Sequence, residues 1–156
     1  VSMLLTSLLL VSCACVFHYT LADHVGSLNP PESDPNTCTC ANDQICHEDD
    51  QGLVCLAACS FTARANVLEA GVFRRIQQYM SIEHDVKLNK DDVILKRVDY
   101  LKSQNRNVFV LAAKNRDADE AARLNGLLGR AFVEAGFLPY QPASLQDIYK
   151  QRFFQH

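Results

Sequence analysis

The stretch Asn107-Val108-Phe109-Val110-Leu111-Ala112-Ala113 is an almost continuous apolar run with polar residues on both sides. A short run of this composition is typical of a strand that is buried on both faces of a sheet. One strand cannot form a sheet alone, so the run requires partners, which we expect within residues 85–88 or within residues 89–103. The run therefore predicts a sheet in the compact part of the chain.

A helix is expected directly after this strand. Asp117-Ala118-Asp119-Glu120 is a capping pattern, because the Asp117 side chain can accept from free helix amides and an acidic residue follows three positions later. Apolar residues then recur at helical spacing, namely Ala121, Leu124, Leu128, Ala131, Phe132 and Ala135. Gly136 supplies a left-handed stop. A final helix is expected from Ser144, burying Leu145, Ile148, Tyr149 and Phe153.

Two earlier segments also carry helical spacing. Over residues 62–80 the stripe consists of Ala65, Leu68, Val72, Ile76 and Tyr79, which predicts a helix there. Residues 89–103 are ambiguous. An acidic start, with Ile94, Val98 and Leu101 at helical spacing, favours a helix, whereas Val93-Ile94-Leu95 also suits the start of a strand.

The amino-terminal residues 1–22 form an apolar segment without a charged residue, and they are expected to be a signal peptide. Thr20-Leu21-Ala22 supplies small residues for cleavage before Asp23, and Ser12-Cys13-Ala14 offers an earlier site. The alternative is an uncleaved membrane anchor. Residues 23–37 contain adjacent prolines and few apolar residues, so they are expected to be a linker.

Seven cysteines are present, two in the leader and five clustered at Cys38, Cys40, Cys46, Cys55 and Cys59. Export to an oxidising compartment would pair the cluster, and an odd number leaves a cysteine that can join two chains. No metal is expected, because a structural zinc site prefers Cys-x2-Cys knuckles and the cluster has none. Asp50-Gln51-Gly52 predicts a turn between strands at residues 44–47 and 53–56.

Residues 38–59 resemble the amino-terminal hairpin of follistatin-type extracellular modules and, more loosely, half of an epidermal-growth-factor-like repeat. The resemblance rests on Cys40, Cys46, Asp50, Gly52 and Cys55. It implies an extracellular compartment and a disulfide-rich style of folding. The chain departs from the follistatin pattern after the hairpin, where Leu56-Ala57-Ala58 separates the last two cysteines and no inhibitor-like cysteine framework follows. The resemblance therefore implies no specific partner.

The chain as a whole is expected to be α+β, with a disulfide-stapled hairpin module at residues 38–59 and a helix-rich α/β domain with a short sheet at residues 60–156. The formal net charge of -3 offers no basic field for nucleic acid or anionic lipid, so a membrane partner is expected only if the leader stays uncleaved.

The candidate ligand-binding residues are Lys114, Asn115 and Arg116, because ligands gather where a strand ends and a helix begins in α/β folds. No catalytic motif and no cofactor are identified. Two functions follow. The preferred one is a secreted protein that binds another protein. The alternative is a small secreted or envelope enzyme that binds an anionic ligand near residues 114–117.

Overall fold

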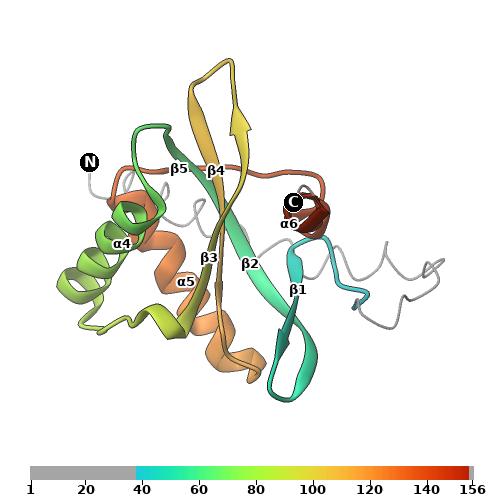
Figure 1. Cartoon of the computed structure of the whole chain (residues 1–156). Coiled ribbons are helices and arrows are strands. Elements are labelled where there is room, and N and C mark those ends of the chain that lie inside the picture. The colour runs from blue at the N-terminus through green and yellow to red at the C-terminus, as the bar shows by residue number, and fades with distance from the viewer. Residues whose placement is uncertain (1–37, 155–156) are drawn as a thin grey trace.

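The structure is a computed structural model that describes residues 38–154. Its helices and strands, in chain order, are β1 (Gln44–Asp49), β2 (Gly52–Arg64), α4 (Glu69–His84), the 3-10 turn η1 (Lys90–Asp92), β3 (Val93–Leu101), β4 (Arg106–Ala113), α5 (Ala118–Glu134), β5 (Leu138–Pro139) and α6 (Leu145–Phe154). The fold is α+β, with a curled antiparallel sheet between helices (Figure 1). The expected signal peptide or membrane anchor and the linker lie outside the described residues.

The central strand of the sheet is β4, as the apolar run predicts. The strand order is β1-β2-β4-β3, and β4 is hydrogen-bonded to β2 on one side and to β3 on the other. Every residue of β4 after Arg106 is buried, because helices cover both faces of the sheet. One expected partner region, residues 89–103, does supply a neighbouring strand. The other, residues 85–88, contains no strand.

The longest strand is β2, which takes part in three pairings, the shortest of them with β5 at Phe61 and Thr62. Its first half pairs with β1 in a hairpin that turns at Asp50-Gln51, where Gly52 adopts a φ of 106°. Its second half, from Ala58 to Arg64, pairs with β4. The predicted hairpin is thus confirmed and is longer than expected. The expected module boundary between residues 59 and 60 falls inside β2, which crosses it without a break.

Alternate side chains of the strands form two cores, one on each face of the sheet. On one face, α4 and α5 pack over a group of rings in which Phe61 stacks on Phe109, Phe132 and Phe137 at centroid distances of 5.7, 4.7 and 5.4 Å. On the other face, α6 packs its buried Leu145 against the sheet (Figure 1). This division follows from the two-residue period of a strand, which sends neighbouring side chains to opposite faces.

The predicted start of the first helix is wrong. Residues 62–64 belong to β2, and α4 begins only at Glu69. Phe61 and Ala63 are fully buried under the helices while their backbone pairs with β4. Burial and a full ladder of hydrogen bonds therefore override the local helical spacing at these residues. The apolar stripe of the helix itself is confirmed from Val72 onward, since Val72 and Ile76 are fully buried.

The helix favoured for residues 89–103 is also wrong, because these residues form η1 and β3. A β-bulge interrupts the pairing with β4 between Arg97 and Asp99. The extra residue shifts the two-residue alternation by one position, so that Ile94, Val98 and Leu101 all pack into the core under α6. A bulged strand thus produces the spacing of four and three residues that a helix also has.

The predicted ends of the two later helices are confirmed. Asp117 is the N-cap of α5, and Gly136 follows the helix with a φ of 93°, a conformation that only glycine adopts without strain. Ser144 precedes α6, and its side-chain oxygen accepts a hydrogen bond from the backbone N–H of Asp147 at 3.3 Å.

Candidate functional site

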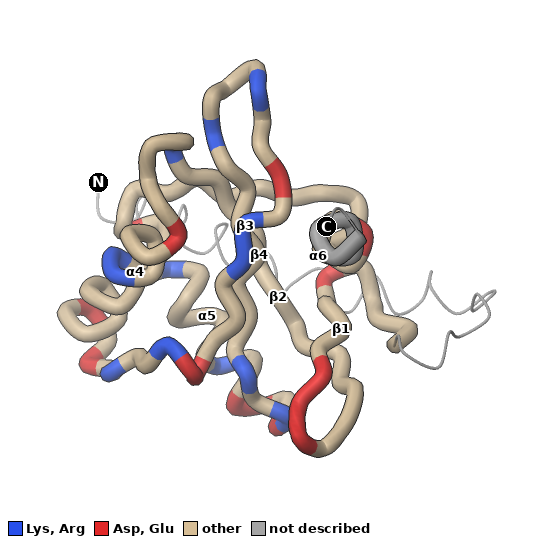
Figure 2. The backbone as a smooth tube through the Cα atoms, in the orientation of Figure 1, with Lys and Arg blue, Asp and Glu red and all other residues tan. Residues whose placement is uncertain are grey.

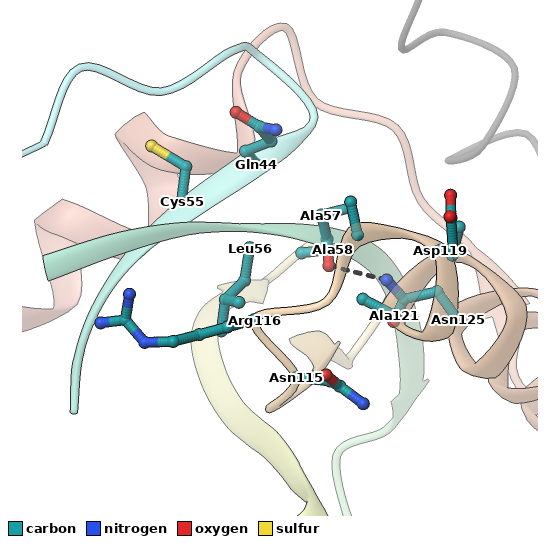
Figure 3. A pocket seen from close by; sticks show the side chains of 12 residues that line it. Gln44, Cys55, Leu56, Ala57, Ala58, Asn115, Arg116, Asp119, Ala121 and Asn125 are labelled. Atoms are coloured by element: carbon teal, nitrogen blue, oxygen red, sulfur yellow. Dashed lines mark hydrogen bonds between the residues drawn. The ribbon is translucent and has the colours of Figure 1, made fainter. Parts of the chain in front are cut away.

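A cavity of about 390 Å³ lies between β2 and the first turns of α5, in the size range of small-ligand pockets. Residues Cys55–Ala58 of β2 line one side. The loop between β4 and α5 contributes Asn115 and Arg116, and α5 contributes residues from Ala118 to Asn125 (Figure 3). The cavity therefore lies at the strand-to-helix junction where the sequence places its candidate residues.

Side-chain bonds to the backbone hold the loop in this position. Asn115 Oδ1 accepts from the backbone N–H of Asp117 at 2.9 Å. Asp117 Oδ1 in turn accepts from the backbone N–H groups of Asp119 and Glu120, at 3.0 and 3.2 Å. The amides at the start of α5 are thereby bonded to a carboxylate of the chain itself. An anionic ligand at this helix start would need the same amides, which Asp117 already occupies.

Arg116 forms an ion pair with the tip of the β1–β2 hairpin. Its guanidinium donates to the two carboxylate oxygens of Asp49 at 2.6 and 2.7 Å, and to the backbone oxygen of Gly52 at 2.9 Å. The hydrogen bonds from Arg116 are the largest cause that lowers the pKa of Asp49, to about 2. Because a carboxylate already neutralises this guanidinium, it offers little net positive charge to the cavity.

Lys114 lies on the same loop but is not among the residues that line the cavity. It is exposed, and its backbone N–H donates to the carbonyl oxygen of Asp92 at 2.9 Å. Its positive charge contributes, after burial of the imidazole, to lowering the pKa of His47 on β1. The structure therefore brings two of the three candidate residues to the cavity, Asn115 and Arg116, whose side chains point away from each other in Figure 3.

Asn125 is the residue that sequence reasoning missed. It is 2% exposed, and its Oδ1 accepts from the backbone N–H of Ala113 at 3.1 Å. Its Nδ2 donates to the carbonyl oxygen of Ala57 at 3.0 Å, the bond drawn dashed in Figure 3. One side chain thus joins the end of β4 to the side of β2 that faces the cavity. The signal in the sequence is an asparagine inside the apolar stripe of a helix, between Ala121 and Leu128.

Four of the predicted cysteines form two disulfides, Cys38–Cys46 and Cys40–Cys55. These bonds fasten the segment before β1 to both strands of the hairpin. The sulfur atoms of Cys38, Cys40 and Cys55 lie within 4.8 Å of one another, a spacing that metal sites also show. All three belong to disulfides, however, and a metal requires thiolates.

Cys59 lies further along β2, 5% exposed, in the core under α4 and α5. It is not a free thiol. A covalent dimer through an odd cysteine remains a prediction that the described residues do not test.

Comparisons with protein families, curated proteins and solved structures give no match for this chain. The resemblance of residues 38–59 to follistatin-type and epidermal-growth-factor-like modules therefore remains a prediction. Among residues 38–154, no helix combines the length and the apolar character needed to cross a membrane.

Proposed function

We propose that this chain is a secreted protein that binds another protein. The observation that carries the proposal is the pair of disulfides, Cys38–Cys46 and Cys40–Cys55, which fasten the hairpin. Disulfides persist in oxidising compartments and are rare in the cytosol. An exported chain would also account for the apolar leader at residues 1–22.

The contents of the cavity favour binding over catalysis. Gln44, Asn115, Arg116 and Asn125 all line it, and each side chain is bonded to another group of the chain. Of the lining residues, Asp119 carries the one carboxylate, and acid–base catalysis ordinarily needs a partner group within hydrogen-bond reach. The polar groups here hold the fold together and leave little for chemistry.

The alternative function, an enzyme for an anionic ligand, has weaker support. It relies on positive charge from Lys114 and Arg116 and on amides at the start of α5. Arg116 is paired with Asp49, and Asp117 caps the amides. The neighbours of Asp49 in the sequence, Glu48 and Asp50, add further negative charge at the hairpin tip, which is red in Figure 2. An anion is therefore a poor match for this surface.

The experiment is the intact mass of the product from secreting cells, measured with and without reduction and alkylation. We expect a chain that begins at Asp23, or after Ala14, and a non-reduced peptide map with Cys38 joined to Cys46 and Cys40 to Cys55. A cell-associated product that retains residues 3–22 would support the membrane-anchored alternative. A cytosolic product in which these four cysteines react as thiols would refute secretion.

A further inference from the structure

The cavity touches four consecutive residues of β2, from Cys55 to Ala58. Successive side chains of a strand point to opposite faces, so a cavity that lies against one face would touch alternate residues only. Contact with all four places part of the cavity at the side edge of the strand, while Gln44 of β1, the partner of Ala57, lines another part. Between Leu53 and Ala57, β2 pairs with β1 on one side, and no strand of residues 38–154 pairs with the other side. We call this side, from Leu53 to Ala57, the open edge.

The hydrogen bonds on either side of β2 show which backbone groups face the open edge. Antiparallel pairing directs the groups of alternate residues toward and away from the partner strand. The amide of Ala58 donates toward the β1 side, to the carbonyl oxygen of Asp43 at 3.0 Å. The carbonyl of Ala57 points the other way and accepts from Asn125. The odd-numbered residues Leu53 and Cys55 therefore direct their N–H and C=O groups to the open edge, where Cys55 lines the cavity.

The two ends of the open edge are marked by side chains from a single loop and helix. Arg116 donates to the carbonyl of Gly52 at one end, and Asn125 donates to the carbonyl of Ala57 at the other. In Figure 3, Arg116 extends alongside β2 in the direction away from Asn125. The open edge between these two contacts is about five residues, or about 16 Å of backbone, long. The cavity borders it from Cys55 to Ala57.

The other edges of the sheet are protected in ways that proteins use against unwanted pairing. On the outer side of β1, Gln146 of α6 accepts from the amide of Cys46 at 2.7 Å. On β3 the bulge next to Arg97 breaks the regular edge, and the amide of Arg97 donates to the Glu69 carboxylate at 3.3 Å. At the open edge of β2, by contrast, the side chains of Arg116 and Asn125 bond only the carbonyls at the two ends, and the cavity lies beside part of the edge between them.

We propose that the open edge binds an extended, positively charged segment of a partner protein, which adds to β2 as a further strand. The N–H and C=O groups of Leu53 and Cys55, which pair with no strand among residues 38–154, can supply main-chain hydrogen bonds to any extended peptide, as in other cases of strand addition. The choice of charge follows from the surroundings. Arg116 is paired with Asp49, which leaves the exposed Lys114 as the unpaired cation of the loop within the described part of the chain. Against it stand three carboxylates, that of Asp119 in the cavity lining and those of Glu48 and Asp50 at the hairpin tip. This inference rests on the proposed function, because it names the kind of segment that the secreted protein would bind.

The first test needs no ligand. Amide hydrogen exchange of the oxidised full-length chain, followed by NMR, should alternate along the hairpin, with fast exchange at Leu53 and Cys55 and slow exchange at Val54 and Leu56. Equal protection of all four amides would overturn the inference. If that protection is lost on dilution, a second copy covers the edge. If it is independent of concentration, other residues of the same chain cover it.

The second test uses a displayed library of random ten-residue peptides, selected on the oxidised protein. We expect β-branched peptides rich in lysine or arginine, which protect Leu53 and Cys55 from exchange when they bind and which bind less tightly in high salt. Failure to select such a peptide, or binding that leaves both amides in fast exchange, would overturn the inference. Peptides that bind elsewhere would leave the proposed protein-binding function intact. A cytosolic, reduced product would refute that function without affecting the exchange pattern.

Variants of Leu53 then separate backbone from side-chain contacts. Leu53→Pro removes an amide that faces the open edge and leaves the bonds to β1 in place. Prolines are tolerated on strand edges for this reason. It should weaken peptide binding about tenfold, the value of one lost hydrogen bond, while the control Leu53→Ala keeps the amide and should bind nearly as well as the wild type. Equal affinities for the two variants would contradict strand addition. If Leu53→Pro does not fold, the exchange measurement on the wild-type complex decides.

Discussion

Replacing Asn125 with alanine should destabilise the fold by about 2 kcal/mol. The substitution removes both hydrogen bonds that join α5 to β4 and β2. Ala113 is 0% exposed, so its N–H would stay buried without a partner, at a cost of about 1–3 kcal/mol. The carbonyl of Ala57 borders the cavity, where water can replace Asn125, so that loss costs about 0.5–1 kcal/mol. The higher helix propensity of alanine returns about 0.6 kcal/mol.

The assay is urea unfolding of the oxidised protein at pH 7, monitored by circular dichroism. Asn115→Ala is the matched control, because it removes an exposed side-chain bond on the same loop and should cost less than about 1 kcal/mol. Asn125→Asp should be at least as harmful as alanine at pH 7, since a carboxylate would face the carbonyl of Ala57, and it should recover partly in acid. A loss below about 0.5 kcal/mol for Asn125→Ala would refute the bridging role.

Three further outcomes are expected. The carboxyl of Asp49 should titrate near pH 2 by NMR. Since this folded pKa lies below the ordinary 3.8, the contribution of the ion pair to stability is complete above about pH 4 and is lost as the pH falls toward 2. Arg116→Gln should return the titration midpoint of Asp49 toward 3.8. An unchanged midpoint would contradict the pairing. The double variant Cys40→Ser, Cys55→Ser opens a loop with a sequence separation of 15 and should lower the unfolding free energy by about 3 kcal/mol in urea, whereas wild-type stability would show that this bond is not formed. Phe61→Ala should cost about 3–5 kcal/mol and Phe61→Leu much less, as measured by thermal unfolding, and equal losses would argue against the stacked core.

Two kinds of element could be predicted from the sequence: a helix with capping residues at both ends, and a strand whose two faces are both apolar. The run from Val108 to Ala113 has no alternation because both faces of β4 are buried. Helix α5 has an acidic cap at Asp117 and a glycine stop at Gly136, and both signals act within one turn of the residues concerned. Such local chemistry can be read without knowledge of the tertiary contacts.

The two wrong assignments have a tertiary cause. In β2, residues 62–64 continue a strand because β4 lies beside them, and nothing local separates that pairing from the start of a helix. In β3, the bulge shifts the alternation of the side chains, so that Ile94, Val98 and Leu101 pack into the same core. The position of a bulge cannot be identified from the sequence alone. Both errors arise where hydrogen bonds to a distant strand decide the structure.

Only part of the candidate site can be derived from the sequence. Strand-to-helix order led to Lys114, Asn115 and Arg116 as candidate ligand-binding residues; Asn115 and Arg116 line the cavity, Lys114 does not, and ligand binding there stays a prediction. The sequence could not reveal that Asp49, far away along the chain, neutralises Arg116, or that Asn125 bridges two strands. These contacts depend on how the β1–β2 hairpin packs beside α5 and the loop before it, which only the folded chain defines.

The continuity of β2 limits which insertions and deletions the gene can accept. This strand carries the disulfide to Cys40 at one end and Phe61 in the aromatic core at the other, with no loop between them to absorb a change in length. A single residue added or removed near Ala57 would turn every later side chain of β2 to the opposite face, moving Phe61 out of its ring stack and into the core under α6. Insertions and deletions should therefore be tolerated in the hairpin turn at Asp50-Gln51. Within β2, inserting or deleting a single residue should destabilise the fold as much as losing the core.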